Sequence, residues 1–335
     1  MAGPRQGSSF GGANNPVELA VMVGMKAQIL TATLLTAFSG ALSAADPQLL
    51  NLVMPDAKVL AGVNVEQAKG TQFGQYVLNQ MQTQDAQLQQ LVALTGFDPR
   101  RDVRELLVAS DGVPGSKTGL ALAKGNFDAA KITAAATLQG VVTEDYNGVT
   151  ILKDPKKQEA GMAFLDATTV AAGDIASVKG AIDRLSTKQS LSATVAVKVN
   201  QWSNSQDAWG ITTVPPASLA PPAKAGAANN PMLNAGQNVQ SAAGGVKFGP
   251  QVVFTGEAQC DTAQNATTLG DVVKLLINLA QMQAGQDPTA AALIKSVSVT
   301  TSGNVVNIAA SLPQDVFQQM LHPQKKIGMG VQRKR

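Results

Sequence analysis

The 335-residue sequence contains one cysteine and one histidine. Because Cys260 is the only cysteine, an intrachain disulfide is excluded. Its apolar neighbours favour a half-buried structural thiol, and a reactive or intermolecular thiol is the alternative. His322 stands close to the C-terminus, before a basic tail, which does not suit the buried base of a Ser-His-Asp or Cys-His site. One histidine and one distant cysteine also make a poor structural zinc site. We therefore expect no catalytic residues, no metal and no cofactor.

Aromatic residues make up 4% of the chain, and charged residues 15%. Few aromatics weigh against a surface on which nucleic-acid bases stack, so no specific nucleic-acid partner is expected. The hydrophobic share of 44% is typical of a folded globular chain.

The net charge of +3 comes mainly from the C-terminal tail. Residues 46–323 hold 19 Lys and Arg against 22 Asp and Glu, a net charge of −3. The tail, 323–335, is expected to be disordered and contains no acid. Its five cations give either a solvated end or a weak contact with an anionic surface. They are Lys325, Lys326, Arg333, Lys334 and Arg335.

Residues 25–45 have the three parts of a secretory signal peptide. Lys26 is the positive residue, 29–42 is an uncharged apolar run of 14 residues, and Ser43-Ala44-Ala45 offers small residues for cleavage. The run is shorter than the roughly 20 residues that a transmembrane helix needs, so no transmembrane span is expected. The sequence predicts a mature chain that begins near Asp46 and is periplasmic or extracellular. Residues 1–24 are expected to be a non-native or disordered extension before a true start at Met25.

Hydrophobic periodicity and turn signals predict alternating helices and strands. Asn126, Asp174 and Pro313 are expected at the starts of three of the helices. The expected helices are 46–54, 71–95, 127–138, 175–185, 191–201, 231–241, 262–283, 288–295 and 313–321. The expected strands are 58–65, 102–110, 118–124, 141–145, 149–153, 161–165, 168–172, 207–214, 245–248, 252–259, 296–301 and 304–310.

The order strand, helix, hairpin, helix, hairpin occurs twice, in 58–153 and in 207–310. The order predicts an α+β chain of two similar units, 46–203 and 204–322, each an antiparallel sheet with helices packed on one face. The hairpin 161–172 and its helix are interpreted as an addition to the first unit, and 215–231 as a loop rich in proline and alanine. The two units are expected to share or stack their sheets.

Three features of the sequence are candidate binding sites. Gly112 to Thr118 superficially suggests a phosphate loop, but a serine separates the second glycine from the lysine, and a strand follows, so a hairpin loop is predicted. Arg100 and Arg101 either bind an anion or pair with the neighbouring aspartates. Trp209 either packs where the two units meet or stacks on a ligand. The candidate ligand or partner contacts are therefore Trp209, Arg100 and Arg101.

Several segments resemble a group of exported bacterial proteins, including acidobacterial ones. The segments are 165–174, the V-K-x-A-I-D pattern at 178–183, 97–103 and Asp207-Ala208-Trp209. The resemblance covers roughly 47–320 and rests on packing and turn motifs. It implies tandem α+β units and export, and no activity.

Three functions are compatible with these features. The first is an exported, non-enzymatic binding or scaffold protein that uses its sheet face or edges. The second is a carrier of an apolar small molecule or lipid, held between the sheet and the helix 262–283. The third is a hydrolase that uses acidic residues, which requires a cleft joining two carboxylates with perturbed pKa values.

Overall fold

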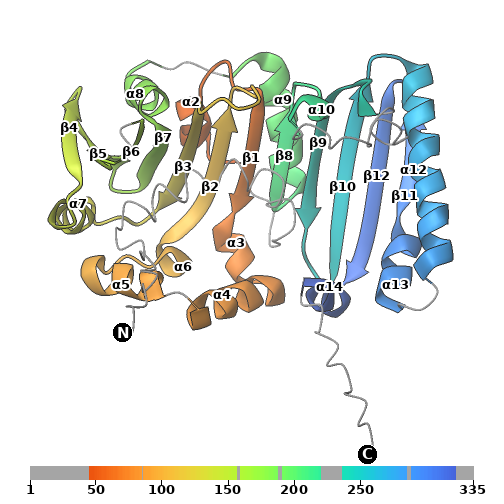
Figure 1. Ribbon diagram of the computed structural model, residues 1–335, viewed down its shortest axis with the longest axis horizontal. Helices are drawn as coiled ribbons and strands as arrows, with labels where there is room; N and C mark the ends of the chain where they lie inside the picture. Colours follow the sequence, from red (N-terminus) through yellow and green to blue (C-terminus); the bar gives the residue numbers. More distant parts are fainter. Residues whose placement is uncertain are drawn as a thin grey trace, which may run out of the picture.

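The computed structural model describes residues 45–84, 86–156, 159–187, 191–219, 236–284 and 288–321. Within these residues, twelve strands form one antiparallel sheet, in the order β11-β12-β10-β9-β8-β1-β2-β3-β7-β6-β5-β4 (Figure 1). Helices connect and cover the strands, which confirms the predicted α+β class.

The strands are β1 (Val59–Asn64), β2 (Val103–Ser110), β3 (Gly119–Gly125), β4 (Val142–Tyr146), β5 (Val149–Lys153), β6 (Ala160–Asp166), β7 (Thr169–Asp174), β8 (Ala208–Thr212), β9 (Val239–Lys247), β10 (Gln251–Cys260), β11 (Ser298–Ser302) and β12 (Val305–Pro313). The helices are α2 (Pro47–Leu52), α3 (Val65–Lys69), α4 (Gln72–Gln84), α5 (Ala86–Thr95), α6 (Pro99–Asp102), α7 (Ala129–Leu138), α8 (Ile175–Asp183), α9 (Ala193–Ser205), α10 (Pro216–Leu219), α12 (Ala263–Gln283), α13 (Pro288–Ser296) and α14 (Gln314–Leu321).

The two halves of the chain share one sheet, because β1 and β8 pair with each other at its centre. The first strand of each half lies at this junction, and the later strands extend outward from it (Figure 1). The two strands are antiparallel, with Ala61 opposite Gly210 in the middle of the pairing. The sheet is therefore continuous across the boundary between the predicted units.

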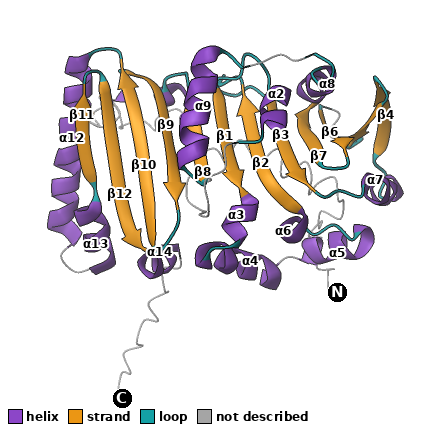
Figure 2. Cartoon of the chain, turned by 180° about the vertical axis from the view of Figure 1, so that it is seen from behind, coloured by secondary structure: helices purple, strands orange, loops and turns teal. Residues whose placement is uncertain are grey.

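The helices lie on both faces of the shared sheet. Helices α2, α8 and α9 cover one face of the first half and of the central strands (Figure 2). Helices α12, α13 and α14 pack on the opposite face of the second half. The largest core cluster lies under α2, α8 and α9, and it includes Leu49, Leu107, Val178, Val199 and Trp202.

The hairpin that is added to the first half is not the predicted hairpin 161–172. In the second half, β12 pairs with β10, and β11 forms the edge. The equivalent position beside β3 is taken by β7 and then β6, whereas β4 and β5 lie farther out. The hairpin β6–β7 is therefore the counterpart of β11–β12, and β4–β5 is the addition. Chain order alone cannot distinguish two hairpins that could each pair with β3.

Three local predictions are wrong at helix or strand ends. The N-cap of α7 is Asp128, whose carboxylate accepts the backbone N–H of Lys131, and not Asn126. Residues 239–241 belong to strand β9 and not to a helix, while 220–235 lie outside the described residues. Pro313 ends β12, where it pairs with Gln251, and α14 begins one residue later. In each case, strand pairing or a nearby cap has a stronger effect than local propensity.

Two short-range predictions are confirmed. Asp174 caps α8 by accepting the backbone N–H of Ser177. Asn147 and Gly148 both have positive φ, as a two-residue type I′ turn between β4 and β5 requires.

Candidate functional site

A cleft of about 540 Å³ lies at the centre of the sheet, over β1, β8 and β9, where the two halves meet. Its floor comes from these strands and from β10, and its rim comes from the β2–β3 loop and from Leu219 of α10. The volume falls within the range of roughly 300–1,000 Å³ that is usual for small-molecule sites. This cleft is the candidate functional site.

The cleft floor consists of unusually small residues. Ala61 lies opposite Gly210, Gly210 lies opposite Gly244, and Gly244 lies opposite Gly256. Directly opposed residues in an antiparallel sheet share a face, so these four form one row across four strands. A row without long side chains leaves a trough over the backbone at this place. We call these four residues the small-residue row.

Packing against other groups does not explain two of the glycines in the small-residue row. A Cβ added at Gly210 would come no closer than 3.7 Å to Ala61 Cβ, and one added at Gly256 no closer than 3.6 Å to Ala243 O. In contrast, a Cβ at Gly62 would lie 2.7 Å from the indole of Trp209, and one at Gly245 would lie 2.4 Å from Gln206 Cγ. A side chain at Gly62 or Gly245 would therefore clash with a neighbour, whereas one at Gly210 or Gly256 would meet its neighbours at ordinary van der Waals distances.

The rim loop, residues 111–118, is organised by one carboxylate. Asp111 accepts the backbone N–H of Val113 at 2.9 Å and the hydroxyl of Ser116 at 2.7 Å. Burial opposes ionisation of Asp111, but these hydrogen bonds and others to its carboxylate hold its pKa below the ordinary value. The loop connects β2 to β3, which confirms the predicted hairpin loop in place of a phosphate loop.

The side chain of Trp209 lies on the face of the sheet opposite the cleft. It is 5% exposed, packs over Gly62, and belongs to the same core cluster as Trp202. Both tryptophans thus pack where the halves join, which is the first of the two roles weighed for Trp209. Trp209 is among the residues that line the cleft, but its indole packs over Gly62 in the core on the other face of the sheet.

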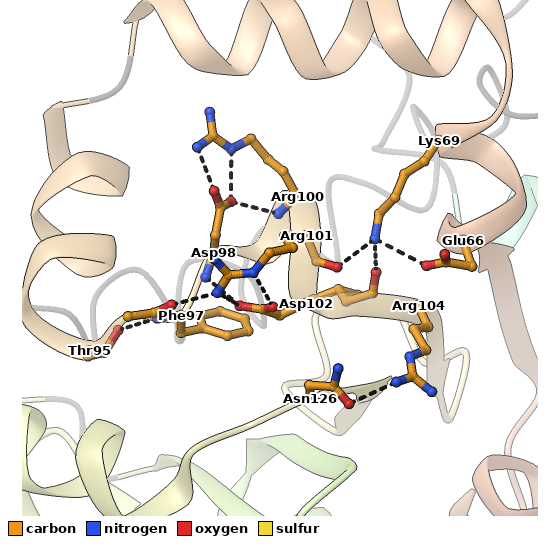
Figure 3. Close-up of polar contacts among 12 residues, drawn as sticks. Glu66, Lys69, Thr95, Phe97, Asp98, Arg100, Arg101, Asp102, Arg104 and Asn126 are labelled. Atoms are coloured by element: carbon orange, nitrogen blue, oxygen red, sulfur yellow. Dashed lines mark hydrogen bonds and ion pairs between the residues drawn. The ribbon is translucent and has the colours of Figure 1, made fainter.

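Arg100 and Arg101 each pair with a neighbouring aspartate (Figure 3). Arg100 donates from Nε and Nη2 to the two oxygens of Asp98, at 2.8 and 2.6 Å. Arg101 donates in the same way to Asp102, at 2.7 Å for each bond. The hydrogen bond from its arginine lowers the pKa of each aspartate. The two aspartates therefore already neutralise the guanidinium groups, and the pairs fix the short helix α6 before β2.

The space between α12 and the sheet, which was expected to hold an apolar ligand in the carrier alternative, is occupied by side chains. Leu269 and Val273 of α12 pack against Val306 of β12 and Cys260 of β10. Cys260 is 1% exposed, and burial raises the pKa of its thiol. The thiol is therefore more deeply buried than the half-buried position expected from the sequence.

Two carboxylates lie close together on the face of the sheet opposite the cleft. Glu105 of β2 accepts the backbone N–H of Asp46 at 3.0 Å, and Lys124 of β3 is paired directly with Glu105 across the strands. Lys124 Nζ lies 4.0 Å from the carboxylate of Asp46. Burial raises the pKa of Glu105 to about 7, although the Asp46 N–H and Lys124 act against this rise. Among the described residues, no group of three or more potential ligands is suited to a metal ion.

Sequence reasoning missed the small-residue row. Its signal is present, because glycine or alanine recurs at alternate positions around 208–210, 242–244 and 256–258. However, the row exists only through register, which one-dimensional patterns do not give. The predicted signal peptide up to Ala44, His322 and the basic tail lie outside the described residues. Among the residues with described structure, no helix has the length and hydropathy to cross a membrane.

Comparison with known proteins does not assign this chain to a family. No protein-family model matches the chain, and no curated protein matches it. A solved structure, described as crystal form I of TP0453, aligns with 83% of this chain and 97% of its own. The identity is 8% and the TM-score is 0.46.

Proposed function

We propose that this chain is an exported, non-enzymatic protein that binds a slender apolar ligand of the acyl-chain class in the central cleft. The observation that carries this proposal is the small-residue row, which opens a trough of about 540 Å³ where the two halves of the sheet meet. The proposal keeps the binding role inferred from the sequence and places the ligand over β1, β8 and β9 rather than under α12.

The shape and chemistry of the floor favour this ligand class. Ala61, Gly210, Gly244 and Gly256 present methyl groups and backbone, and Val59 and Ala242 extend the apolar surface. Such a floor makes few directional hydrogen bonds, so it selects by shape and apolar contact. A trough one side chain deep suits a chain of methylene groups better than a broad ring system.

The polar groups at the cleft do not favour a reaction. Asp111 lines the cleft, but hydrogen bonds to Val113 and Ser116 occupy its carboxylate. The close pair of acids, Asp46 and Glu105, lies on the other face of the sheet and is shared with Lys124. The hydrolase alternative required two carboxylates in one cleft, and this arrangement gives it no support.

Export is supported by the pattern of residues 25–45 and by the resemblance to exported bacterial proteins. The predicted cleavage position also immediately precedes Asp46, which is the N-cap of α2.

Binding can be tested with the mature protein and a fluorescent polyene fatty acid as the probe. Leucine at Gly210 or Gly256 fills the trough without meeting a close neighbour at Cβ. We expect Gly210→Leu and Gly256→Leu to weaken probe binding at least about tenfold, or about 1.4 kcal/mol, with little change in the thermal midpoint. Thr300→Leu, an exposed position on the other face, is the matched control and should bind as the wild type does.

Mass spectrometry of organic extracts from the purified protein provides a second readout, with co-purifying acyl compounds expected. A wild-type protein that neither binds the probe nor carries such a compound would refute the ligand class. If the leucine variants bind the probe as the wild type does, the cleft is excluded as the binding site.

A further inference from the structure

We infer that Glu105 and Lys124 form a docking site for the new N-terminus that processing creates at Asp46. The inference rests on the export part of the proposed function and not on the ligand. Its basis is the placement of Asp46 N, 3.0 Å from Glu105 Oε1, on the face of the sheet covered by α2. Asp46 is also the residue at which the mature chain is expected to begin.

Cleavage changes the charge of the atom that touches Glu105. Hydrolysis of the Ala45–Asp46 peptide bond adds the hydroxyl of water to the carbonyl carbon of Ala45 and its hydrogen to the nitrogen of Asp46. The freed amine then takes a proton from solvent, because an α-amine has a pKa of about 7.7–8.0. A neutral N–H donor thus becomes an ammonium at the same position, with three donors.

Before cleavage, the Asp46 and Glu105 carboxylates both lie near the ammonium of Lys124. Among the described residues, Lys124 is the cation that acts on Glu105, and its ammonium lies 4.0 Å from the carboxylate of Asp46. Lys124 is also shared with the hydroxyl of Thr169, at 3.2 Å, and with the amide oxygen of Gln48. Burial and the excess negative charge together explain the raised pKa of Glu105. The α-ammonium of Asp46 supplies the second positive charge.

The local backbone holds Asp46 in place for this contact. Its carboxylate accepts the backbone N–H of Gln48 at 2.7 Å, and its carbonyl accepts that of Leu50 at 3.1 Å. Pro47 fixes the first turn of α2, and Leu49 and Leu52 anchor the helix in the core. The amine therefore docks on a fixed helix start. Ala45 is buried before cleavage. Cleavage therefore removes the contacts of its methyl group and replaces them with the ion pair between the Asp46 amine and Glu105.

The first test is the identity of the mature N-terminus. The full-length chain is exported from a bacterial host, and the product is analysed by intact mass and by sequencing of its terminal peptide. We expect Asp46 as the first residue, and a mature chain that starts elsewhere overturns the inference. If the chain is not exported, the export proposal fails, and the docking site is then tested on a chain released at Asp46 from a fusion.

The second test measures the α-amine itself. In the folded protein near pH 7.5, acylation of the Asp46 amine is expected to be at least tenfold slower in the wild type than in Glu105→Gln. Glu159→Gln, at an exposed glutamate, is the control and should match the wild type. Equal rates in wild type and Glu105→Gln overturn the inference.

If Glu105→Gln does not fold, the pKa of the wild-type amine decides the question. Docking requires a value above the ordinary 7.7–8.0, and a value within or below that range refutes it. Probe binding is measured independently of amine docking, because the cleft lies on the face of the sheet opposite Glu105. Loss of one property without the other therefore shows which proposal has failed.

Discussion

The contact between Gly62 and Trp209 at the junction of the two halves is the sharpest test of the fold. The two residues are opposite each other in the β1–β8 pairing, and the indole covers the glycine. In Gly62→Ala, the new Cβ would lie 2.7 Å from Trp209 Cε2 and Cζ2, against a favourable carbon–carbon distance of about 3.5–4.0 Å. The ring is 5% exposed, so it cannot turn away into solvent.

Overpacking of this kind costs about 1–3 kcal/mol of unfolding free energy. A central value of about 2 kcal/mol corresponds to a fall in thermal midpoint of about 3 °C, because an unfolding entropy of roughly 2.1 cal/mol/K per residue gives about 1.6 °C per kcal/mol for a mature chain of about 290 residues. The measurement is urea unfolding followed by tryptophan fluorescence and circular dichroism, together with a thermal scan.

Two further variants make this prediction specific. Gly210→Ala, where the nearest heavy atom is 3.7 Å from the added Cβ, should change stability by less than about 0.5 kcal/mol. Adding Trp209→Phe to Gly62→Ala should recover part of the loss, as a favourable coupling in a double-mutant cycle. A Gly62→Ala protein as stable as the wild type would show that the two halves do not join as described.

Two other predictions concern stability at a charged pair and at a turn. Asp102→Asn should cost about 1–3 kcal/mol at pH 7, because the buried Asp102 carboxylate accepts two hydrogen bonds from Arg101 and one from the backbone of Asp98. Since that arginine lowers the pKa of Asp102, the stabilisation is present above the ordinary value of 3.8 and is lost as the pH falls below it. Urea unfolding of both proteins at several pH values should show the difference shrinking with acid, and a difference independent of pH would contradict the role of the charge. Gly148→Ala should cost about 1 kcal/mol, because the φ of 77° is strained for any residue with a Cβ. An unchanged thermal midpoint for Gly148→Ala would contradict that turn geometry.

Local rules were sufficient where a structure depends on a few adjacent residues. Asn147-Gly148 predicted a tight hairpin because positive φ is easiest for these two residues. Asp174 predicted the start of α8 because its carboxylate can accept an N–H three residues on. Where two signals competed within a few residues, as with Asn126 and Asp128, the sequence did not show which one the chain uses.

Pairing and packing decided what the sequence left open. The sequence predicted the two α+β halves and, among its alternatives, the Arg–Asp pairs, because composition and spacing carry that information. It could not predict that β1 joins β8, or that β6–β7 lies beside β3. Strand order depends on burial summed over the whole sheet, and many orders share the same alternation of residues.

The candidate site also depends partly on sequence and partly on tertiary structure. The glycines and alanines of β1, β8, β9 and β10 were visible in the sequence, and each is an ordinary strand residue by itself. Only register aligns Ala61, Gly210, Gly244 and Gly256 into one row and opens the cleft. Likewise, the sequence predicts that the mature chain begins near Asp46, but only tertiary contact places the nitrogen of Asp46 against Glu105. Sequence determined which residues are available, and packing of distant strands determined which of them meet.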